Sequence, residues 1–563
     1  MLEFLVYLVA GIGYGFYYDL NLLETVLVVS AIVLARRAWI SQERIERVWR
    51  RLLRIALRPS FAVAAVFVLA LAVRAVVLPV FPVPHPVITD EFSHLLLADT
   101  LAHGRLTNPT HPLWPHFESI HIIQRPTYNS DYFPGQAAVL AAGQLLGHPW
   151  IAVWLLSAAM CAALCWMLQA WVPPAWAVVG ALLAIIRLDI GSYWVNGYYG
   201  GCLAALGGAL ALGAYPRLWR RGSWWTSLLF GSGIVAIGFT RPFEGLAVAI
   251  PALGALAVAI ARKKARWWTA APATAILLAG FACFLAYDQA VTGNVFRTPY
   301  AVNQAEYGWP MTLPWMHAAE AQFRHVELRR YYDYERDVHD RNATVLGLIK
   351  NSTLKAQEIW RFYFGPALSV PLILLPLVWR RGRLRFLLWI GVLTLLATLT
   401  EVGTSPHYAA AATGCFVAAE VACLRELCRR AWGVRYVAAV PAILLLVLAA
   451  RAGLEQFHLP FTQRVNYQSW CCVHPGNPAK TQITAKLDQI GGRHLVLVRP
   501  KTDPDNVLQW IYNDADIDNS RIVWARDMGP RENAELLRYF HDRTSWVLDP
   551  NVTPPRIERW DPH

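Results

Sequence analysis

The segment PVITDEFSHLLLADTLAHGRL carries two adjacent carboxylates, Asp90 and Glu91, ten residues beyond an apolar run at 61–80. A helix is expected to begin here, capped by Thr89 or Asp90 and favoured by acidic side chains in its first turn. If the pair has only a structural role, that role is to stabilise the start of this helix. However, the pair also adjoins a predicted membrane surface, where aromatic neighbours and an apolar helix face could hold it. A carboxylate held there can take a proton from a hydroxyl, which is general-base chemistry.

Two further polar segments lie between apolar runs at the same predicted face of a membrane. Arg241 and Glu244 occur in GFTRPFEGLAV. They could form an i,i+3 ion pair that closes a tight turn, or Arg241 could bind phosphate through its guanidinium fork. In EVGTSPHY, His407 and Tyr408 begin the next helix, where the histidine is either a packing residue or a participant in chemistry.

Three other groups of residues are weaker candidates. Arg297 and Tyr300, in a loop with a TG turn, could face a lipid headgroup. Tyr198 and Tyr199 could stack on a sugar, although close helix packing explains most of their Gly- and Ala-rich surroundings. A third group is loosely spaced and does not indicate a tetrahedral metal site: His111, His116, Glu118 and His121. No metal ligand and no cofactor are therefore predicted, and a divalent metal is left open.

The elements that must position these residues are apolar runs of roughly the length that spans a bilayer. The chain has 563 residues, of which 56% are hydrophobic and only 16% are charged. Candidate spans lie at about 3–18, 20–36, 61–80, 151–172, 174–190, 199–216, 224–240, 243–261, 267–287, 363–379, 386–401, 407–424 and 434–452. The first two are short and could instead form a re-entrant hairpin. We therefore expect an α-helical polytopic membrane protein with about 11–13 transmembrane helices.

The positive charge is concentrated in five short segments between these runs: 36–58, 217–221, 262–266, 380–385 and 425–435. They contain 23 of the 51 Lys and Arg residues but only three of the 38 acids, although the whole chain has a net charge of +13. A nucleic-acid-binding protein would gather its charge on one face. If the N-terminus is cytoplasmic, alternation places all five segments in the cytoplasm, as the positive-inside rule expects.

The same alternation divides the chain into three parts. Residues 1–60 would form an N-terminal helical hairpin and a basic cytoplasmic segment. Residues 61–452 would form the transmembrane domain, with large outer loops at 81–150 and 288–362 and an interfacial helix at 134–147. Residues 453–563 would lie outside the cytoplasm. The chain is thus expected in the plasma (inner) membrane, with a periplasmic or extracellular C-terminal domain.

The C-terminal part has a different pattern from the apolar runs. HLVLVR (494–499), RIVWAR (521–526) and SWVLD (545–549) have the composition of short buried strands. The segments 503–512 and 529–540 have helical patterns. Alternating strands and helices predict a small α/β domain. It contains neither a GxGxxG loop nor a P-loop, so nothing indicates nucleotide binding.

The order of these features resembles the GT-C superfamily of membrane glycosyltransferases, which includes protein O-mannosyltransferases and lipid A aminoarabinose transferases. The features are the acid pair in a large first loop, the element Tyr132-Phe133-Pro134 before a short outer helix, a TG…PY loop, a Pro-His-Tyr turn and a C-terminal outer domain. The resemblance covers about 61–452, and its most specific motif is TDEFSHLLLADTLAHGRL (89–106). The family's Arg-Pro-Asp element in the second outer turn is missing, because Asp189 is not at the matching place. The Lys that often precedes the family's Pro-Pro element is also missing.

The resemblance implies transfer of a monosaccharide from a polyprenyl-phosphate carrier to a hydroxyl of a lipid, glycan or protein acceptor, with inversion. It implies that Asp90 is the base and that Glu91 is a supporting or acceptor-positioning acid. The leaving phosphate needs cationic stabilisation, for which Arg241, Arg297, His407 and Arg125 are the candidates. The remaining candidate binding residues are Glu244, Tyr408, Tyr132, Tyr198 and Tyr199.

Two alternatives come from other functional classes. A multi-pass transporter or flippase would be expected to show paired charges or broken helices near the midplane and internal repeats. Arg74, Arg187 and Glu420 lie inside or near predicted spans, but no convincing repeat accompanies them. A non-catalytic assembly scaffold would make the acid pair incidental. A large first loop and an α/β domain are unusual for a transporter, which favours the transferase.

Overall fold

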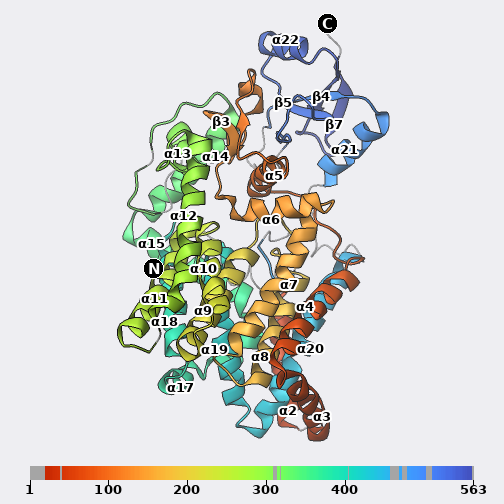
Figure 1. Ribbon diagram of the computed structural model, residues 1–563. Coiled ribbons are helices and arrows are strands. Elements are labelled where there is room, and N and C mark those ends of the chain that lie inside the picture. Colours follow the sequence, from red (N-terminus) through yellow and green to blue (C-terminus); the bar gives the residue numbers. More distant parts are fainter. Residues whose placement is uncertain are drawn as a thin grey trace.

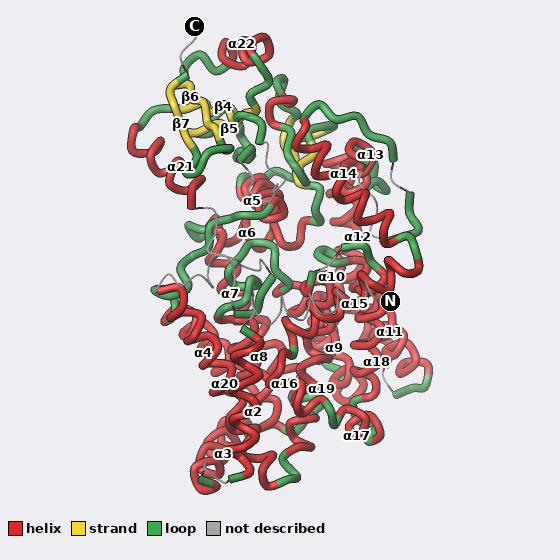
Figure 2. Tube along the Cα trace, turned by 180° about the vertical axis from the view of Figure 1, so that it is seen from behind, coloured by secondary structure: helices red, strands yellow, loops and turns green. Residues whose placement is uncertain are grey.

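The computed structural model describes residues 20–37, 41–264, 266–308, 313–317, 319–403, 405–456, 468–471, 478–501 and 510–560. Figure 1 shows a tall molecule with a helical region at one end and the C-terminal strands at the other. Helices α5 (Thr89–Ala102) and α6 (Pro134–Leu145) lie between these two parts, as both Figure 1 and Figure 2 show. The predicted span at 3–18 lies outside the described residues.

The helical region is built mainly from long apolar helices. Its elements are α2 (Asn21–Arg36), α3 (Gln42–Ala56), α4 (Pro59–Val76), α7 (Pro149–Leu168), α8 (Pro174–Ala184), η2 (Ile185–Ile190), α9 (Cys202–Arg221), α10 (Trp224–Gly238), α11 (Pro242–Ala261), η3 (Trp267–Ala270), α12 (Ala271–Thr292), α16 (Gly365–Leu372), α17 (Leu375–Arg380), α18 (Arg385–Thr400), η4 (Pro406–Ala412), α19 (Thr413–Leu427) and α20 (Ala431–Gln456). Several begin with a proline at the first helical position, where its fixed φ suits the helix and its missing N–H costs no hydrogen bond.

Six helices in the described part of the chain are long and apolar enough to cross a membrane: Pro59–Val76, Pro149–Leu168, Pro242–Ala261, Trp267–Thr292, Pro406–Leu427 and Ala431–Leu454. Two shorter apolar helices, Trp224–Gly238 and Arg385–Thr400, accompany them. Their composition suggests a membrane protein. The predicted span at 363–379 is divided into α16 and α17, because Pro376 cannot donate to Leu372 and its ring would clash with that carbonyl.

The segments predicted to be outer loops, 81–150 and 288–362, form a layer above the helical region. It contains η1 (Trp114–Phe117), α13 (Pro299–Tyr307), α14 (Val326–Asn342), α15 (Val345–Tyr363) and three short strands, β1 (Asn108–Pro109), β2 (Ile122–Ile123) and β3 (Thr127–Ser130). The strands form an antiparallel sheet in the order β1-β3-β2. The predicted interfacial helix at 134–147 is present as α6, which packs against α5 and α7.

The C-terminal part contains a four-stranded sheet in the order β5-β4-β6-β7. The strands are β4 (His494–Val498), β5 (Ile522–Arg526), β6 (Thr544–Asp549) and β7 (Arg556–Arg559), and the helices are α21 (Pro478–Ile490) and α22 (Pro530–Tyr539). Strand β4 pairs in parallel with β5 and β6, whereas β7 is antiparallel to β6. The three predicted strands and the helix at 529–540 are present. The helix predicted at 503–512 is wrong for 510–512, which are not helical, and its other residues lie outside the described part.

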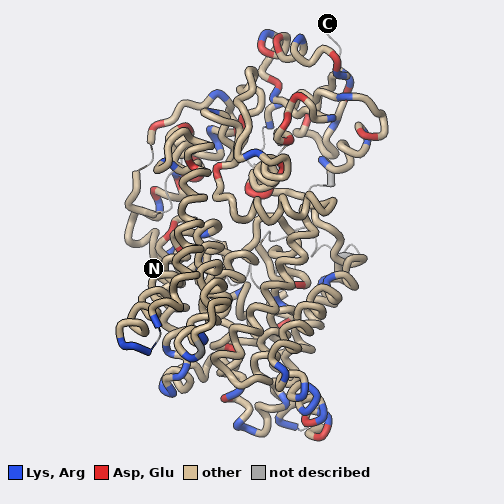
Figure 3. The backbone as a smooth tube through the Cα atoms, in the orientation of Figure 1, with Lys and Arg blue, Asp and Glu red and all other residues tan. Residues whose placement is uncertain are grey.

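Charge is distributed unevenly along the molecule. Figure 3 shows Lys and Arg gathered at the end of the helical region where α3 and α17 lie, far from the C-terminal strands. Around the C-terminal strands, basic and acidic residues are interspersed. The apolar helices between the two ends carry few charges. This is the separation that the positive-inside rule expects of a chain whose basic loops share one side of a membrane.

Candidate functional site

A cavity of about 220 Å³ lies where the layer formed by the segments 81–150 and 288–362 meets the ends of the apolar helices. Six segments that are far apart in the sequence contribute to its wall. The lining residues are His94, Tyr132, Phe133, Gln136, Tyr199, Gly200, Gly201, Ala204, Thr240, Arg241, Pro242, Phe243, Glu244, Thr298, Tyr300, Glu401, His407 and Tyr408. Six of the nine predicted binding residues therefore share one cavity: Arg241, Glu244, His407, Tyr408, Tyr132 and Tyr199.

Arg241 is the cationic centre of this cavity. It immediately precedes α11, so the turn from α10 fixes the start of its side chain. Its guanidinium lies 4.3 Å from the ring centroid of Tyr408, and Nη1 is 3.9 Å from Oε1 of Glu244. Nη2 donates a hydrogen bond to Nε2 of His407. The predicted i,i+3 ion pair is present, but it is long, and the guanidinium still lines the cavity.

The bond from Arg241 determines the tautomer of His407. Arginine can only donate, so Nε2 of His407 must accept, and the ring proton of the neutral imidazole is on Nδ1. Nδ1 lies 3.0 Å from the hydroxyl of Tyr193, which also accepts from the backbone N–H of His407 at 3.0 Å. His407 is thus a buried residue with both ring nitrogens engaged. In this arrangement it orients Arg241.

Glu401 is a site residue that sequence reasoning did not select, although it began the segment that contains His407. It is 1% exposed and lines the cavity at the end of α18. Its carboxyl group is hydrogen-bonded to that of Glu244. Lys355 donates to the backbone carbonyl of Glu401, and at 3.2 Å to that of Thr398. Oε1 of Glu401 has no hydrogen-bond partner among the described residues. It is therefore available to a polar ligand.

Asp90 lies beside the cavity at the start of α5. Its side chain is 28% exposed, and its Oδ1 accepts a hydrogen bond from Oγ1 of Thr89 at 3.2 Å. Burial lowers the pKa of His94 to about 4, and the nearby charges of Asp90 and Arg241 act on it in opposite directions. Asp90 itself does not line the cavity, but His94, one helical turn after it on α5, shares the cavity wall with Arg241.

His94 itself was not predicted as a site residue. It lies one helical turn after Asp90, on the same face of α5. Its ring is 8% exposed and 4.7 Å from the ring of Tyr132. Its Nδ1 is buried and has no hydrogen-bond partner in the described structure. The i,i+4 spacing from Asp90 is the signal that could have identified it.

Glu91 has a different environment from Asp90. It is 4% exposed, whereas the Asp90 side chain is 28% exposed, and neither residue lines the cavity. Oε2 accepts hydrogen bonds from the backbone N–H groups of Val87 at 2.7 Å and Ile88 at 3.3 Å, and Oε1 accepts from that of Tyr198 at 2.9 Å. Burial raises the pKa of Glu91 to about 7, against these three donors. The carboxylate therefore fixes the entry to α5.

Three predicted binding residues do not line the cavity. Nη2 of Arg125 is 3.0 Å from Oε1 of Glu306, and its guanidinium lies 4.4 Å from the Trp114 ring. Arg297 is exposed. Tyr198 is buried, and its hydroxyl donates to the backbone carbonyl of Pro84 at 2.9 Å. These three residues were selected by type and by their place in outer loops, neither of which determines side-chain direction.

The histidine-rich part of the first loop is distributed over separate contacts. Nε2 of His111 lies 3.1 Å from Asp518, and Nδ1 of His116 lies 3.0 Å from the carbonyl of Arg526. Glu118 contacts Arg324 and His325 at 3.2 and 3.0 Å. Within the described residues, no group of three or more His, Cys, Asp or Glu side chains is arranged to hold a metal ion. Most of these contacts tie the loop to the C-terminal domain or to the segment before α14.

The cavity wall formed by η4 depends on glycines in and just before α9. A Cβ atom added to Gly208 would lie 1.9 Å from the carbonyl oxygen of Ala411, and one added to Gly201 would meet the ring of Trp194 at 2.5 Å and Ala410 at 2.7 Å. Only glycine permits this approach of two backbones. The Gly- and Ala-rich pattern, which predicts close packing, thus positions the segment that carries His407.

Comparison with known proteins gives only distant structural similarity. No protein-family model matches the chain, and no curated protein matches it. Among solved structures, the chain is similar to the oligosaccharyltransferase of Archaeoglobus fulgidus in its apo form, with 11% identity over 87% of this chain and 69% of that one and a TM-score of 0.44. The same enzyme tethered to an acceptor peptide gives 12% identity, coverage of 86% and 68%, and a TM-score of 0.44.

A third similar structure is the archaeal oligosaccharyltransferase AglB from Archaeoglobus fulgidus with an inhibitory peptide and a dolichol-phosphate. Here the identity is 11%, the coverage is 86% of this chain and 69% of that one, and the TM-score is 0.39. Both identity and TM-score are low in all three comparisons.

Proposed function

We propose that this chain is a membrane glycosyltransferase that transfers a monosaccharide from a polyprenyl-phosphate carrier to an acceptor hydroxyl. In this reaction the acceptor oxygen forms a bond to the anomeric carbon while the bond from that carbon to the phosphate oxygen breaks. The hydroxyl proton goes to Asp90, and the polyprenyl phosphate leaves as an anion. Direct displacement of this kind inverts the anomeric centre.

One observation carries the proposal. Asp90 lies one helical turn before His94 on α5, and His94 lines the same cavity as Arg241, between the apolar helices and the loops above them. The carboxylate of Asp90 is partly exposed and can accept a proton. Arg241 can stabilise the charge that develops on the phosphate. A base beside the cavity and a cation in its wall match a reaction that needs a proton acceptor and an anion site close together.

The cavity also offers unsatisfied polar atoms for a sugar. Nδ1 of His94 and Oε1 of Glu401 are buried, line the cavity and have no hydrogen-bond partner in the described structure. An unmade hydrogen bond at a buried atom costs about 1–3 kcal/mol. A polyhydroxylated ligand would remove that cost, so we assign these two atoms to the hydroxyl groups of the donor sugar.

The substitution Asp90→Asn tests the proposal. Asparagine keeps the shape of aspartate and caps a helix about as well, but it cannot act as the base. Transfer from radiolabelled polyprenyl-phosphate sugars should fall by about 10²–10⁴-fold, with unchanged thermal stability. Asp333→Asn is the matched control, because Asp333 is 55% exposed and contacts Arg336, away from the cavity. Near-normal transfer by Asp90→Asn would remove Asp90 from the mechanism.

The contacts of the buried arginines favour the transferase over a transporter. A transport pathway would present ionisable side chains to a cavity near the midplane. Nη2 of Arg74 donates to Oδ1 of Asn196 at 2.9 Å, and Nε of Arg187 donates to the carbonyl of Phe362 at 2.7 Å. These bonds join distant segments of the chain. The two arginines therefore have a structural role in packing.

A further inference from the structure

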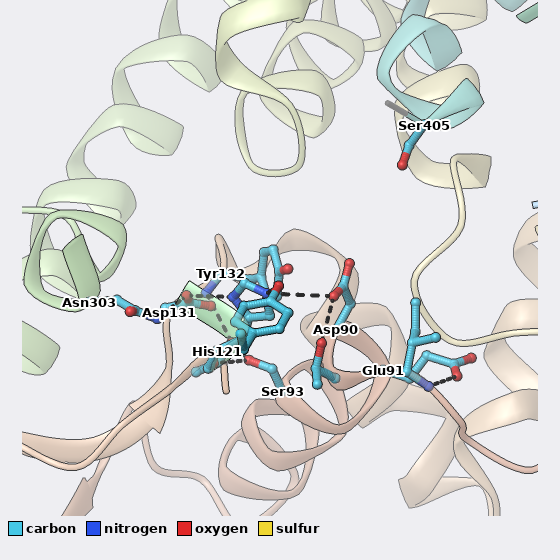
Figure 4. A network of polar contacts seen from close by, with 12 residues as sticks. Asp90, Glu91, Ser93, His121, Asp131, Tyr132, Asn303 and Ser405 are labelled. Atoms are coloured by element: carbon cyan, nitrogen blue, oxygen red, sulfur yellow. Dashed lines mark hydrogen bonds and ion pairs between the residues drawn. The ribbon is translucent and has the colours of Figure 1, made fainter. Parts of the chain in front are cut away.

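His121 lies between two carboxylates. Its Nδ1 is 3.1 Å from Oδ2 of Asp131, and its Nε2 is 3.9 Å from Oδ1 of Asp90 and 2.9 Å from the hydroxyl of Tyr331. Figure 4 shows the ring between the two acids, with Glu91 on the other side of Asp90. Sequence reasoning considered His121 only as a metal ligand, a use for which its spacing gave no support.

Asp131 is the buried member of this group. Its side chain is fully buried, whereas that of Asp90 is 28% exposed. Besides His121, Oδ2 of Asp131 accepts a hydrogen bond from Nδ2 of Asn303, whose Oδ1 accepts from the hydroxyl of Tyr332 at 3.1 Å. A buried carboxylate is costly unless it is paired with a positive charge. His121 is the cationic group that contacts it.

The charges around His121 favour its protonated form. Burial alone lowers the pKa of His121, but the charge and hydrogen bond of Asp131 outweigh it, with smaller contributions from Asp90 and Glu335, so that the pKa is raised. Its other titratable neighbours include Tyr331, Tyr132 and His94. Burial raises the pKa of both tyrosines well above its usual range and lowers that of His94 to about 4, so these three groups are neutral near pH 7.

The backbone holds His121 in place independently of its ring. Its carbonyl accepts hydrogen bonds from Oγ of Ser93 at 2.6 Å and from the backbone N–H of Asp131 at 3.2 Å. Ser93 lies on α5, three residues after Asp90. The φ angle of His121 is 60°, in the left-handed region that few non-glycine residues adopt. The ring is thus fixed relative to the helix that carries the proposed base.

We propose that His121 is a positioning residue for the transfer reaction. As an imidazolium paired with the buried Asp131, it holds the Asp90 carboxylate in place beside the cavity. The proposal rests on the proposed function only in so far as positioning Asp90 assists transfer. The pairing of Asp131, His121 and Asp90 is a property of the resting protein, and it can be measured without activity.

The first measurement follows the charge of His121 itself. Hydrogen–deuterium exchange at C2 of histidine, read by mass spectrometry over a range of pH, gives the protonation midpoint of a single histidine in the full-length chain. The midpoint of His121 should lie above that of histidine in a denatured sample of the same chain. It should fall in Asp131→Asn, and by a smaller amount in Asp90→Asn. The proposal would be overturned if the His121 midpoint is not raised, or if it is unchanged in both variants.

The second measurement follows the pH dependence of transfer. His121→Asn is the suitable variant, because asparagine tolerates a positive φ better than most residues and carries no charge. Loss of an opposite charge at this distance should move the acidic limb of the profile upward. His111→Asn is the matched control: it removes another buried histidine of the same loop that contacts an acid, Asp518. Its acidic limb should stay in place.

The outcomes separate this proposal from the proposed function. A purely structural His121 would lower the melting temperature or the maximal rate of His121→Asn and leave the acidic limb unchanged, which would refute the positioning role. If the wild-type chain transfers no sugar from polyprenyl-phosphate donors, the proposed function fails. The exchange midpoints of His121 then still decide whether the pair with Asp90 exists.

Discussion

Arg241 donates a hydrogen bond to Nε2 of His407, and its guanidinium lies against the ring of Tyr408. These contacts use the planar fork of arginine, which lysine does not have. They hold one cation at the cavity while leaving it 26% exposed. The proposed phosphate site thus depends on geometry as well as on charge.

Arg241→Lys should weaken the binding of polyprenyl phosphate by about 10–100-fold, the equivalent of one charge-assisted hydrogen bond of about 1.5–3 kcal/mol. Arg241→Met, which removes the charge, should weaken it further. The measurement is equilibrium binding of polyprenyl phosphate to the purified chain. Arg329→Lys, at an exposed position on α14, is the control. Equal affinity of Arg241→Lys and the wild type would place the phosphate elsewhere.

Glu401→Gln should distinguish binding of the sugar of the donor from binding of its polyprenyl phosphate. Glu401 lines the cavity with an unpartnered Oε1, whereas the bonds described for Arg241 do not involve it directly. The variant should bind bare polyprenyl phosphate as the wild type does and bind the sugar-bearing donor at least about tenfold more weakly. His94→Phe should behave in the same way. A uniform loss for both ligands would mean that Glu401 supports the fold of the site instead.

Glu91→Gln should lower the thermal stability of the protein, whatever it does to the rate of transfer. A glutamine would turn an amide N–H₂ toward at least one of the backbone donors of Val87, Ile88 and Tyr198. Loss of such a bond at a buried site costs about 1–3 kcal/mol. Thermal unfolding should show a lower midpoint, whereas Asp90→Asn should not. An unchanged midpoint in Glu91→Gln would contradict the anchoring role.

Glu91 also gives a pH dependence of stability. Because burial raises its pKa to about 7, the folded state binds more protons than the unfolded state between the ordinary glutamate range and pH 7. The free energy of unfolding should therefore fall as the pH rises from about 4.5 to 7. Glu91→Gln cannot titrate and should lack this contribution. Unfolding curves of both proteins across this pH range give the comparison.

The side of the membrane occupied by each end of the molecule is a further prediction. Since the basic loops gather at the end opposite the C-terminal strands, residues after 453 should lie outside the cytoplasm. A reporter that is active only in the cytoplasm, fused after His563, should give no signal. The same reporter fused after the basic segment at 262–266 should be active. Signal from the C-terminal fusion would place these residues in the cytoplasm and contradict the predicted topology.

Six of the thirteen predicted spans coincide with helices long and apolar enough to cross a membrane, and two more with shorter apolar helices, because the sequence signal for such helices is local. A run of apolar residues with a proline at its start and a basic loop at its end identifies a span without knowledge of its neighbours. The split between α16 and α17 was missed because the apolar composition of 363–379 concealed Pro376. Helix α21 and strand β7 were missed because their patterns are weak and depend on the sheet that they complete.

The candidate site was predictable in part. Arg241 and His407 are at the ends of apolar runs. Because position in such a run determines depth in the predicted membrane, a contact between the two residues could be expected. Glu91 could not be distinguished from Asp90 in this way, because adjacent residues on a helix point about 100° apart and only the surrounding structure shows which of them is buried against backbone donors. The role proposed for His121 depends on Asp131 and Tyr331, which come from separate segments.

The contact of Gly208 with Ala411 has a consequence for how this protein can change over time. A Cβ at position 208 would lie 1.9 Å from a backbone oxygen, so even alanine would push η4 and its histidine out of register with Arg241. Random mutagenesis should therefore find position 208 as intolerant as Asp90, although Gly208 carries no functional group. Variation that alters the acceptor or sugar should instead accumulate among the side chains of the outer loops.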